Sequence, residues 1–400
     1  MTPGTRVSER IEAFNKSLLQ DKVKLKYKLM AANAYRFYRG TCHLFYEDLS
    51  TQASFPSSPQ TWICGDLHLE NFGSYKANNR FVYFDQNDFG ESILAPSAWE
   101  LVRMITSIFV AFEKEENKVR EWAELYLDTY CDTLTGGKEK HIEARLANGI
   151  VKSFLERISK RTSKQLLRKQ VIKKKRRNYL FIDNRKYFSL EDSLKAELLD
   201  HLKKWISVKS RKLTEYEVED VAFRVAGTGS LGVKRYVFLL HNLKRRNSFL
   251  LLDMKESRPS SLQKYVSIPQ PVWASNAERE VAIQLRMQDA AVALTDTIQF
   301  RDDFFVIQEL QPAEDKIDMT LLVDREKDIR CIIEDMAVLT ASAQLRSSGR
   351  QGSAIADELI EFGKSRGWQS DILAYAKHYS KQVQTYYKEF SNDYNKGYFK

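Results

Sequence analysis

The nine residues 65–73, GDLHLENFG, constrain this chain more than any other segment. They follow a short apolar run, residues 62–64, which predicts a strand, and they lead into a turn. Asp66 precedes Asn71 by five positions. A carboxylate can orient or deprotonate a hydroxyl group, and an amide oxygen can bind a hard cation such as Mg²⁺. The segment therefore predicts a loop that joins a catalytic carboxylate to a metal ligand.

A second acidic strand follows at residues 81–90, FVYFDQNDFG. An Asp, an Asn five positions later and then a metal-binding Asp form the order found in kinase catalytic loops. We therefore predict Asp66 as the catalytic base or orienting residue and Asn71 as a magnesium ligand. Asp85 is the preferred second ligand because it ends the strand. Asp88, which precedes Phe-Gly, is the alternative or an additional carboxylate.

Residues 227–232 form a G-x-G-x-x-G pattern between two stretches of strand character, 221–226 and 233–240. In the dinucleotide-binding fold such glycines open a helix, whereas in kinases they form a hairpin over the phosphates. The strands on both sides favour the kinase hairpin, and an ordinary glycine-rich hairpin is the alternative. Glycine lets backbone amides approach phosphate oxygens closely. The predicted nucleotide-binding residues of this turn are Gly227, Thr228, Gly229, Ser230 and Gly232.

Lys255 ends the next apolar strand, residues 249–256. A lysine at this place contacts the nucleotide phosphates in kinases, and a glutamate on the following helix forms an ion pair with it. The helix predicted over residues 276–291 offers Glu278 or Glu280 for this pair. Glu278 is the preferred partner. The alternative for either residue is that it is an acidic residue on the protein surface with no such role.

The strand at residues 304–310, which contains Glu309, takes the place of the hinge whose backbone binds adenine. The order of the parts is exchanged, because the catalytic loop precedes the glycine turn, the lysine and the hinge. A circular permutation explains this order. We therefore predict an α+β, protein-kinase-like fold with two lobes. Residues 1–215 and 312–400 form a large helical lobe, and residues 216–311 form a small, mostly β nucleotide lobe.

Five segments resemble an uncharacterised bacterial family. Its members carry F-x-R-G, C-G-D-x-H-x-E-N-F-G, F-D-x-N-D-F-D-E, W-D-x-x-R and A-x-A-x-x-R-S-G patterns. The corresponding segments here are residues 35–40, 64–73, 84–91, 99–103 and 339–349. The family is similar to aminoglycoside-phosphotransferase-like kinases in permuted order. The resemblance spans nearly the whole chain and implies ATP and Mg²⁺ as cofactors, but it implies no particular acceptor.

The sequence departs from the family pattern at three positions. Gly90 and Glu100 stand where Asp is usual, and Gln344 stands where His is common. The resemblance implies that Asp66 is the catalytic carboxylate. His68 is a second catalytic candidate that contacts substrate or phosphate; the alternative is that it fixes the loop by hydrogen bonds.

Composition and targeting signals indicate a cytoplasmic globular enzyme. Hydrophobic residues make up 43% of the 400 residues, enough for a sizeable core. There is no apolar run long enough to span a bilayer, and residues 1–20 lack the apolar core of a signal peptide. The four cysteines are scattered, so we expect no disulfide and no zinc site.

The net charge of +10 has one main source. Between Arg157 and Arg177 there are eleven Lys and Arg residues and no acidic residue. Such a run can dock an acidic partner, nucleic acid or anionic lipid. The alternative is a solvated basic helix and loop, and the lack of interleaved aromatic residues argues against single-strand nucleic-acid binding.

Three functions remain open from the sequence. The first is an ATP- and Mg²⁺-dependent phosphotransferase, with a small-molecule acceptor favoured over a protein. The second is transfer of AMP by the same residues with ATP inverted. The third is an inactive nucleotide-binding scaffold that acts through its basic surface.

Overall fold

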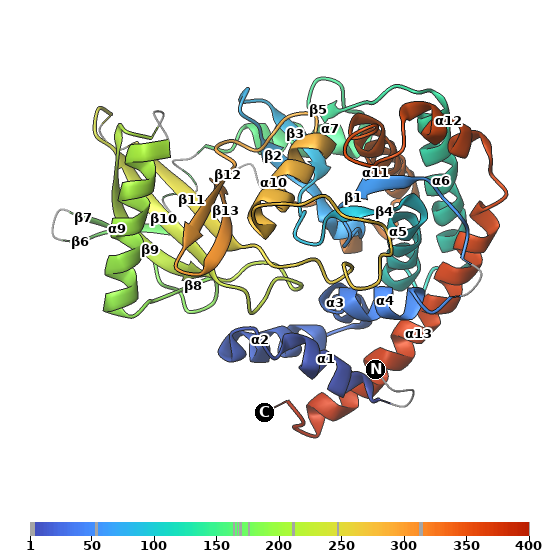
Figure 1. Cartoon of the computed structure of the whole chain (residues 1–400), viewed down its shortest axis with the longest axis horizontal. Helices are drawn as coiled ribbons and strands as arrows, with labels where there is room; N and C mark the ends of the chain where they lie inside the picture. The colour runs from blue at the N-terminus through green and yellow to red at the C-terminus, as the bar shows by residue number, and fades with distance from the viewer. Residues whose placement is uncertain are drawn as a thin grey trace.

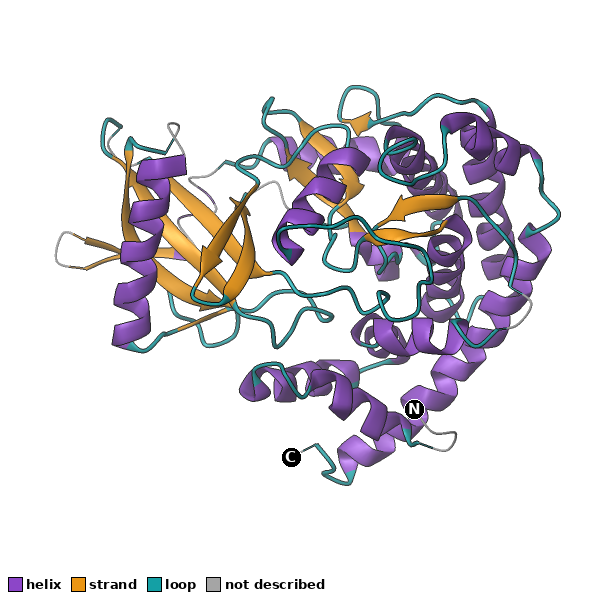
Figure 2. Cartoon of the chain, in the orientation of Figure 1, coloured by secondary structure: helices purple, strands orange, loops and turns teal. Residues whose placement is uncertain are grey.

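The computed structural model of the chain describes residues 5–399, apart from residues 53–54, 163–164, 166, 168–169, 175–176, 210–212, 246–247 and 312–314. It is a mixed α and β protein with several small sheets. A six-stranded sheet with its covering helix forms one part of the molecule (left in Figure 1). A larger group of helices forms the other part, as the colours of Figure 2 show.

The six-stranded sheet contains the elements that the sequence assigned to a nucleotide lobe. Every pairing in it is antiparallel. Its strands, in spatial order, are β12 (Asp296–Phe300), β13 (Asp303–Glu309), β11 (Phe249–Glu256), β10 (Arg235–Asn242), β9 (Tyr216–Arg224) and β8 (Tyr187–Phe188). The glycine turn joins β9 to β10, so it closes a strand–turn–strand hairpin as predicted.

One face of the sheet is covered by α9 (Asp192–Lys209). Leu198, Leu202 and Ile206 follow helical spacing and belong to one buried apolar cluster with side chains of the sheet such as Phe238. A helix and a strand that precede residue 216 therefore pack with the sheet. The predicted boundary at residue 215 lies inside this part of the molecule.

Helix α5 (Ser97–Ala111) lies in the interior of the helical part, and its residues are almost all buried. A helix that is apolar on all sides has to lie in the interior. It packs against α6 (Glu116–Thr135) and α13 (Gln369–Asn395). Helices α11 (Glu326–Arg346) and α12 (Ala356–Lys364) pack against α6, and α7 (Gly149–Ser159) packs against α11. The N-terminal helices are α1 (Val7–Asn15), α2 (Gln20–Met30), α3 (Ala34–Gly40) and α4 (Cys42–Leu49).

Short strands connect these helices to the catalytic loop. They are β1 (Gln60–Ile63) paired with β4 (Ile93–Pro96), and β2 (Phe72–Lys76), β3 (Val82–Gln86) and β5 (Ile142–Glu143) in a second small sheet. The helix that follows the six-stranded sheet's β11, α10 (Asn276–Met287), contacts both β13 and α11. It therefore links the two parts of the molecule.

The two ends of the described chain lie close together. The backbone N–H of Val7 in α1 donates to the carboxylate of Glu389 in α13 at 2.8 Å. Near the C-terminus, the Tyr398 hydroxyl donates to Glu12 at 3.0 Å. Figure 1 shows both termini on the same side of the helical part.

Two expectations about the chain as a whole agree with the structure. All four cysteines are free. In the described part of the chain, no helix has the length and apolarity needed to cross a bilayer.

The basic run is only partly described. Its described strands, β6 (Val171–Lys174) and β7 (Arg177–Leu180), form a hairpin. Lys173 and Arg177 are exposed, and Arg161 forms an ion pair with Asp315. Several of the other basic residues lie outside the described ranges.

Candidate active site between the sheet and the helices

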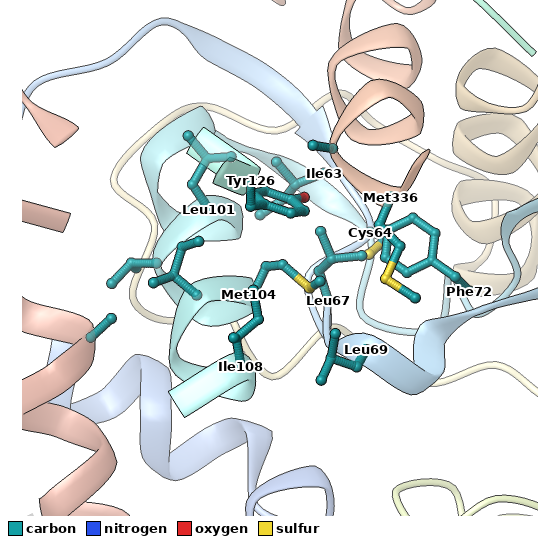
Figure 3. Close-up of a cluster of buried hydrophobic side chains, with 14 of the residues drawn as sticks. Ile63, Cys64, Leu67, Leu69, Phe72, Leu101, Met104, Ile108, Tyr126 and Met336 are labelled. Atoms are coloured by element: carbon teal, nitrogen blue, oxygen red, sulfur yellow. The ribbon is translucent and has the colours of Figure 1, made fainter. Parts of the chain in front are cut away.

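The catalytic loop is held by apolar side chains that alternate with its polar ones. Leu67 and Leu69 are buried and lie in a cluster with Met104 and Ile108 of α5 (Figure 3). The short 3₁₀ helix η1 (Leu69–Asn71) follows. This anchoring fixes the backbone that carries the polar residues Asp66, His68 and Glu70.

Helix α5 orients the loop through two side chains one turn apart. Arg103, fully buried, donates through Nε to Asp66 Oδ1 at 2.8 Å and forms an ion pair with the same oxygen. Glu100 accepts the backbone N–H of Cys64 at 2.7 Å. Residues three apart lie on the same side of a helix, which explains the spacing of this motif. Burial raises the pKa of Asp66, although Arg103 opposes the shift.

The side-chain amide nitrogen of Asn71 forms hydrogen bonds, whereas its amide oxygen has no partner among the described residues. Its Nδ2 donates to the carbonyl oxygens of Asp66 at 3.0 Å and Asp88 at 3.3 Å. Its Oδ1 is buried and has no hydrogen-bond partner among the described residues. A buried polar atom without a partner is costly, and an oxygen ligand for a hard cation explains it.

Lys255 lies between two carboxylates. Its ammonium is 2.9 Å from Asp88 and 3.9 Å from Glu280. Partial desolvation alone would raise the pKa of Asp88, whose side chain is 52% exposed, but Lys255, the Gly90 N–H and Lys316 together lower it to about 2. Asp88 is therefore ionised at neutral pH and can bind a cation as well as Lys255.

The prediction that Glu278 pairs with Lys255 is wrong. Glu278 lies in the first turn of α10, where its carboxylate accepts the backbone N–H of Ala274 at 2.5 Å. Glu280 is buried and reaches Lys255. Residues two apart in a helix are about 200° apart around its axis, so only one of the two can face the sheet.

Asp85, the preferred magnesium ligand, lies apart from this cluster. It is buried in β3, where its carboxylate accepts the N–H of Gln86 at 2.8 Å. Burial raises its pKa to about 7. Asp88, not Asp85, lines the cavity described below, so the structure favours the alternative carboxylate.

The glycine turn lies directly over the catalytic loop. A side chain at Gly229 would place Cβ 3.2 Å from the Arg39 carbonyl oxygen and 3.6 Å from Asp66 Oδ2. Gly227 and Gly232 have positive φ values of 74° and 101°. The turn therefore needs glycine both for space and for backbone conformation.

The other two predicted residues of the turn differ in exposure. Thr228 is buried, and the Ser230 hydroxyl donates to the Ala226 carbonyl at 2.9 Å. Ser230 lines the cavity. The backbone N–H of Leu19, just before α2, donates to the Gly232 carbonyl at 2.9 Å, so the N-terminal helices hold the turn from outside.

A cavity of about 560 Å³ joins these groups. Its lining combines the catalytic loop, the Asp-Phe-Gly segment, the glycine turn, Lys255 and the N-terminal helices. Its lining includes the side chains of Asp66, Asp88, Lys255, Glu280, Lys26 and His43, together with Gly229. In the described part of the chain, no group of three or more His, Cys, Asp or Glu side chains could hold a metal ion alone. Magnesium sites often have one or two protein carboxylates plus phosphate and water oxygens, which fits Asp88 and Asn71.

Of the predicted site residues, Asp66, Asp88, Gly229, Ser230 and Lys255 line this cavity. The others do not: Asn71, Asp85, Gly227, Thr228, Gly232, Glu278, His68 and Glu309. His68 is buried, and its Nδ1 accepts the N–H of Glu70 at 3.1 Å. Burial lowers its pKa well below the usual value, so the ring is neutral. Glu309 forms an ion pair with Arg80 at 3.2 Å. The arrangement of His68 matches the loop-fixing alternative.

The apolar face of the sheet beside Lys255 is covered. Ala222, Val237 and Leu251 lie on that face and form a buried cluster with Leu180 and Tyr187. Leu180 belongs to β7 of the hairpin that contains part of the basic run, and Tyr187 belongs to β8 of the sheet itself. In a kinase this face packs against adenine, so this chain has its own side chains there.

The backbone of the predicted hinge is also used within the protein. The N–H of Glu309 donates to the Ala293 carbonyl, and the N–H of Leu310 donates to the Leu251 carbonyl, both at 2.9 Å. Neither amide is free for a base in this arrangement.

Sequence reasoning missed four residues around the cavity. Arg103 and Glu100 belonged to a motif that was noted, but no role was assigned to either. Lys26 and His43 carried no signal, because each lies in an ordinary amphipathic helix. Only the fold brings them to the cavity.

Comparison with known proteins gave one match. The profile of a family described as "Uncharacterized protein conserved in bacteria (DUF2252)" matches residues 18–393. No curated protein and no solved structure matches the chain. The match starts at a cavity residue, Leu18, and ends in α13, so it includes both parts of the molecule.

Proposed function

Since the chain belongs to this bacterial family, whose description gives no activity, we propose a function from the geometry. The protein is a nucleotide- and magnesium-dependent phosphotransferase with a kinase-like, circularly permuted arrangement. One observation carries the proposal: Lys255 is held between Asp88 and Glu280, Asn71 donates to the Asp88 carbonyl, and the glycine turn lies over Asp66.

Each residue of the cluster has a task that its surroundings support. Asp66 uses Oδ1 to bind Arg103, which leaves Oδ2 beside Gly229 to orient an acceptor hydroxyl or take its proton. Asn71 Oδ1 and the Asp88 carboxylate would hold magnesium, which neutralises phosphate charge when bound. Lys255 and the amides of the glycine turn would bind phosphate oxygens. Catalysis would then come from positioning and charge neutralisation.

The permuted order accounts for the sequence positions of these groups. The strand hairpin, the lysine strand and α10 follow one another as in a kinase nucleotide lobe, but they come after the catalytic loop. The proximity of the two chain ends is what a permutation requires.

AMP transfer is a second candidate, favoured by the covered face of the sheet. An adenine ring cannot pack beside Leu251 while Leu180 and Tyr187 occupy that face, and the hinge amides are paired. The open cavity lies next to Asp66, Asp88 and the glycine turn instead. A nucleotide that binds with its base in this cavity would present its α-phosphate to Lys255.

The binding test uses thermal unfolding with ATP, with and without Mg²⁺. We expect a Mg²⁺-dependent rise in melting temperature for the wild type that is lost in Asp88→Asn. Asp85→Asn is the matched control, because Asp85 lies outside the cavity, and it should keep the rise. A nucleotide at 100 times its dissociation constant adds about 2.7 kcal/mol of stability. The absence of any rise with the wild type would contradict nucleotide binding at this site, and with it the proposed function.

The chemical test uses ATP labelled at the γ or the α phosphate, with a small-molecule extract as the acceptor source. Phosphotransfer moves the γ label, whereas AMP transfer moves the α label. Asp66→Asn should lower transfer by at least a hundredfold while nucleotide binding persists. Normal turnover in that variant would contradict the role of the loop.

A further inference from the structure

The cavity is also lined by a buried cation that forms no ion pair in the described part of the chain. Lys26, in α2, is 2% exposed and lines the cavity. Among the described residues its Nζ hydrogen-bonds only Asn15 Oδ1, at 3.0 Å. Burial lowers its pKa to about 8, so the ammonium is still the main form at neutral pH. A buried charge without a counter-ion is costly.

His43 lies beside this lysine with both ring nitrogens unsatisfied. The ring is 3% exposed, lines the cavity and stacks on Phe14 at 3.8 Å. The Lys26 ammonium is 5.9 Å from the centre of the same Phe14 ring. Neither nitrogen of His43 has a hydrogen-bond partner among the described residues. Burial lowers the pKa of His43 well below its usual value, so the neutral ring has one N–H donor and one acceptor nitrogen. A ligand with acceptor atoms would pair with the Lys26 ammonium and with this N–H, and a ligand donor would pair with the other nitrogen.

The carboxylates that line the cavity already have donors of their own. Each is hydrogen-bonded or ion-paired to another group, and none forms an ion pair or a hydrogen bond with Lys26 in the described part of the chain. The pairs are Asp66 with Arg103, Asp88 with Lys255, Glu91 with the Ser261 N–H, Glu256 with the Lys234 N–H and Glu280 with the Ser257 hydroxyl. Glu91 and Asp66 act on Lys26 only through space, so its ammonium keeps donor capacity for an anion from outside the chain.

We infer that Lys26 and His43 bind the anionic group of a small hydroxyl compound, a phosphate or a carboxylate, in the same cavity as Asp66. That this compound is the acceptor rests on the proposed function. The binding of the anion does not rest on the proposed function, because it depends on residues of α1, α2 and α4 and on none of the groups assigned to magnesium. The acceptor class is thus a small molecule with a hydroxyl group at one end and an anionic group at the other.

The test measures melting temperature without nucleotide or Mg²⁺, with glycerol 3-phosphate, glycerate or glycerol at millimolar concentration. These probes share a three-carbon skeleton and differ in the charged group. We expect one or both charged probes to raise the melting temperature by about 1–3 °C at ten times the dissociation constant. Glycerol should have no such effect. Stabilisation by only one charged probe identifies the anion as phosphate or as carboxylate.

The variants separate this site from the nucleotide site. Lys26→Met and His43→Phe, which keep the shape and the stacking, should lose the effect. Lys24→Met, on the exposed side of α2, and Lys255→Met should keep it. Equal stabilisation of the wild type and Lys26→Met, or loss of the effect in Lys255→Met, would overturn the inference. So would a wild type that neither charged probe stabilises, whatever the outcome with ATP.

Discussion

At the scale of single residues, two departures from the family pattern turn out to be neighbours. Glu100 and Gln344 differ from the usual Asp and His, and they are 244 positions apart in the chain. Gln344 Nε2 donates to Glu100 Oε2 at 3.0 Å, while Glu100 Oε1 accepts from Cys64. The Glu100 side chain is one methylene longer than the usual Asp, and its partner is the amide of Gln344 where the family commonly has His. The pair therefore supports the start of the catalytic loop as one unit.

Loss of Arg103 should destabilise the protein strongly. Arg103→Met leaves the buried carboxylate of Asp66 without its cation, and breaking a buried pair in this way costs about 3–5 kcal/mol. Urea unfolding measures the loss. Arg120→Met, on the exposed surface, should change stability by less than about 0.5 kcal/mol. Equal effects of the two substitutions would contradict the account of Asp66.

The stability of the protein should depend on pH through Asp85. Burial raises its pKa to about 7, whereas an unfolded Asp titrates near pH 4. The folded state holds a proton that the unfolded state releases, so this group lowers stability as pH rises from about 4 to 7. Asp85→Asn removes the effect, and its melting temperature relative to wild type should increase between about pH 5 and pH 8. The exposed Asp302→Asn should show no such trend.

At the scale of elements, the glycine turn depends on the N-terminal helices. Leu19 donates to the Gly232 carbonyl, and Arg258 donates to the Ser17 hydroxyl at 2.6 Å. The sequence predicts the turn from its glycines alone. The contact with residues more than two hundred positions away fixes how the turn lies over Asp66.

Gly232→Ala should destabilise this arrangement. The new Cβ would lie 2.9 Å from Leu18 Cβ, and φ at this position is +101°. A strained φ of this kind costs about 1–3 kcal/mol before the clash is counted. Gly367→Ala is the control, because a Cβ there meets nothing within 4 Å and φ is not positive. Denaturant midpoints that shift equally in both variants would count against the close packing of the turn.

At the scale of the whole molecule, an experiment can test whether the fold depends on the order in which its segments follow one another in the chain. The two ends meet through α1 and α13, and the stretch between α9 and β9 connects two elements of the sheet part. A variant that begins at residue 213, ends at residue 209 and joins the present ends by a flexible linker would have the linear kinase order.

We expect this permuted variant to fold and to keep the Mg²⁺-dependent response to ATP. Joining ends that already lie close costs little entropy. Circular dichroism and thermal unfolding measure the outcome. A variant opened inside β11, between residues 252 and 253, should not fold, since it breaks a central strand. Loss of the fold in both variants would contradict the permutation.

Local patterns determined much of the site in advance. Strands were expected at residues 221–226, 233–240, 249–256 and 304–310, and these ranges overlap β9, β10, β11 and β13. The helix expected over residues 276–291 is α10, which ends at Met287. The reason is local: strand and helix periodicity, glycine content and motif spacing depend on neighbouring residues. The spacing of the apolar residues in α10 also indicates which of its acidic residues faces inward. Glu280, Ile283 and Met287 lie on one helix face, which identifies Glu280 as the inward acid.

The tertiary structure alone decided which groups meet. The choice of Asp88 over Asp85 depends on where the chain leaves β3, and part of the cover on the apolar face of the sheet comes from a separate hairpin segment. Lys26 reaches the cavity because α2 and the residues just before it pack against the glycine turn, and His43 of α4 is placed there by stacking on Phe14 of α1. Burial and charge pairing arise between segments that are distant in sequence, so no local pattern records them.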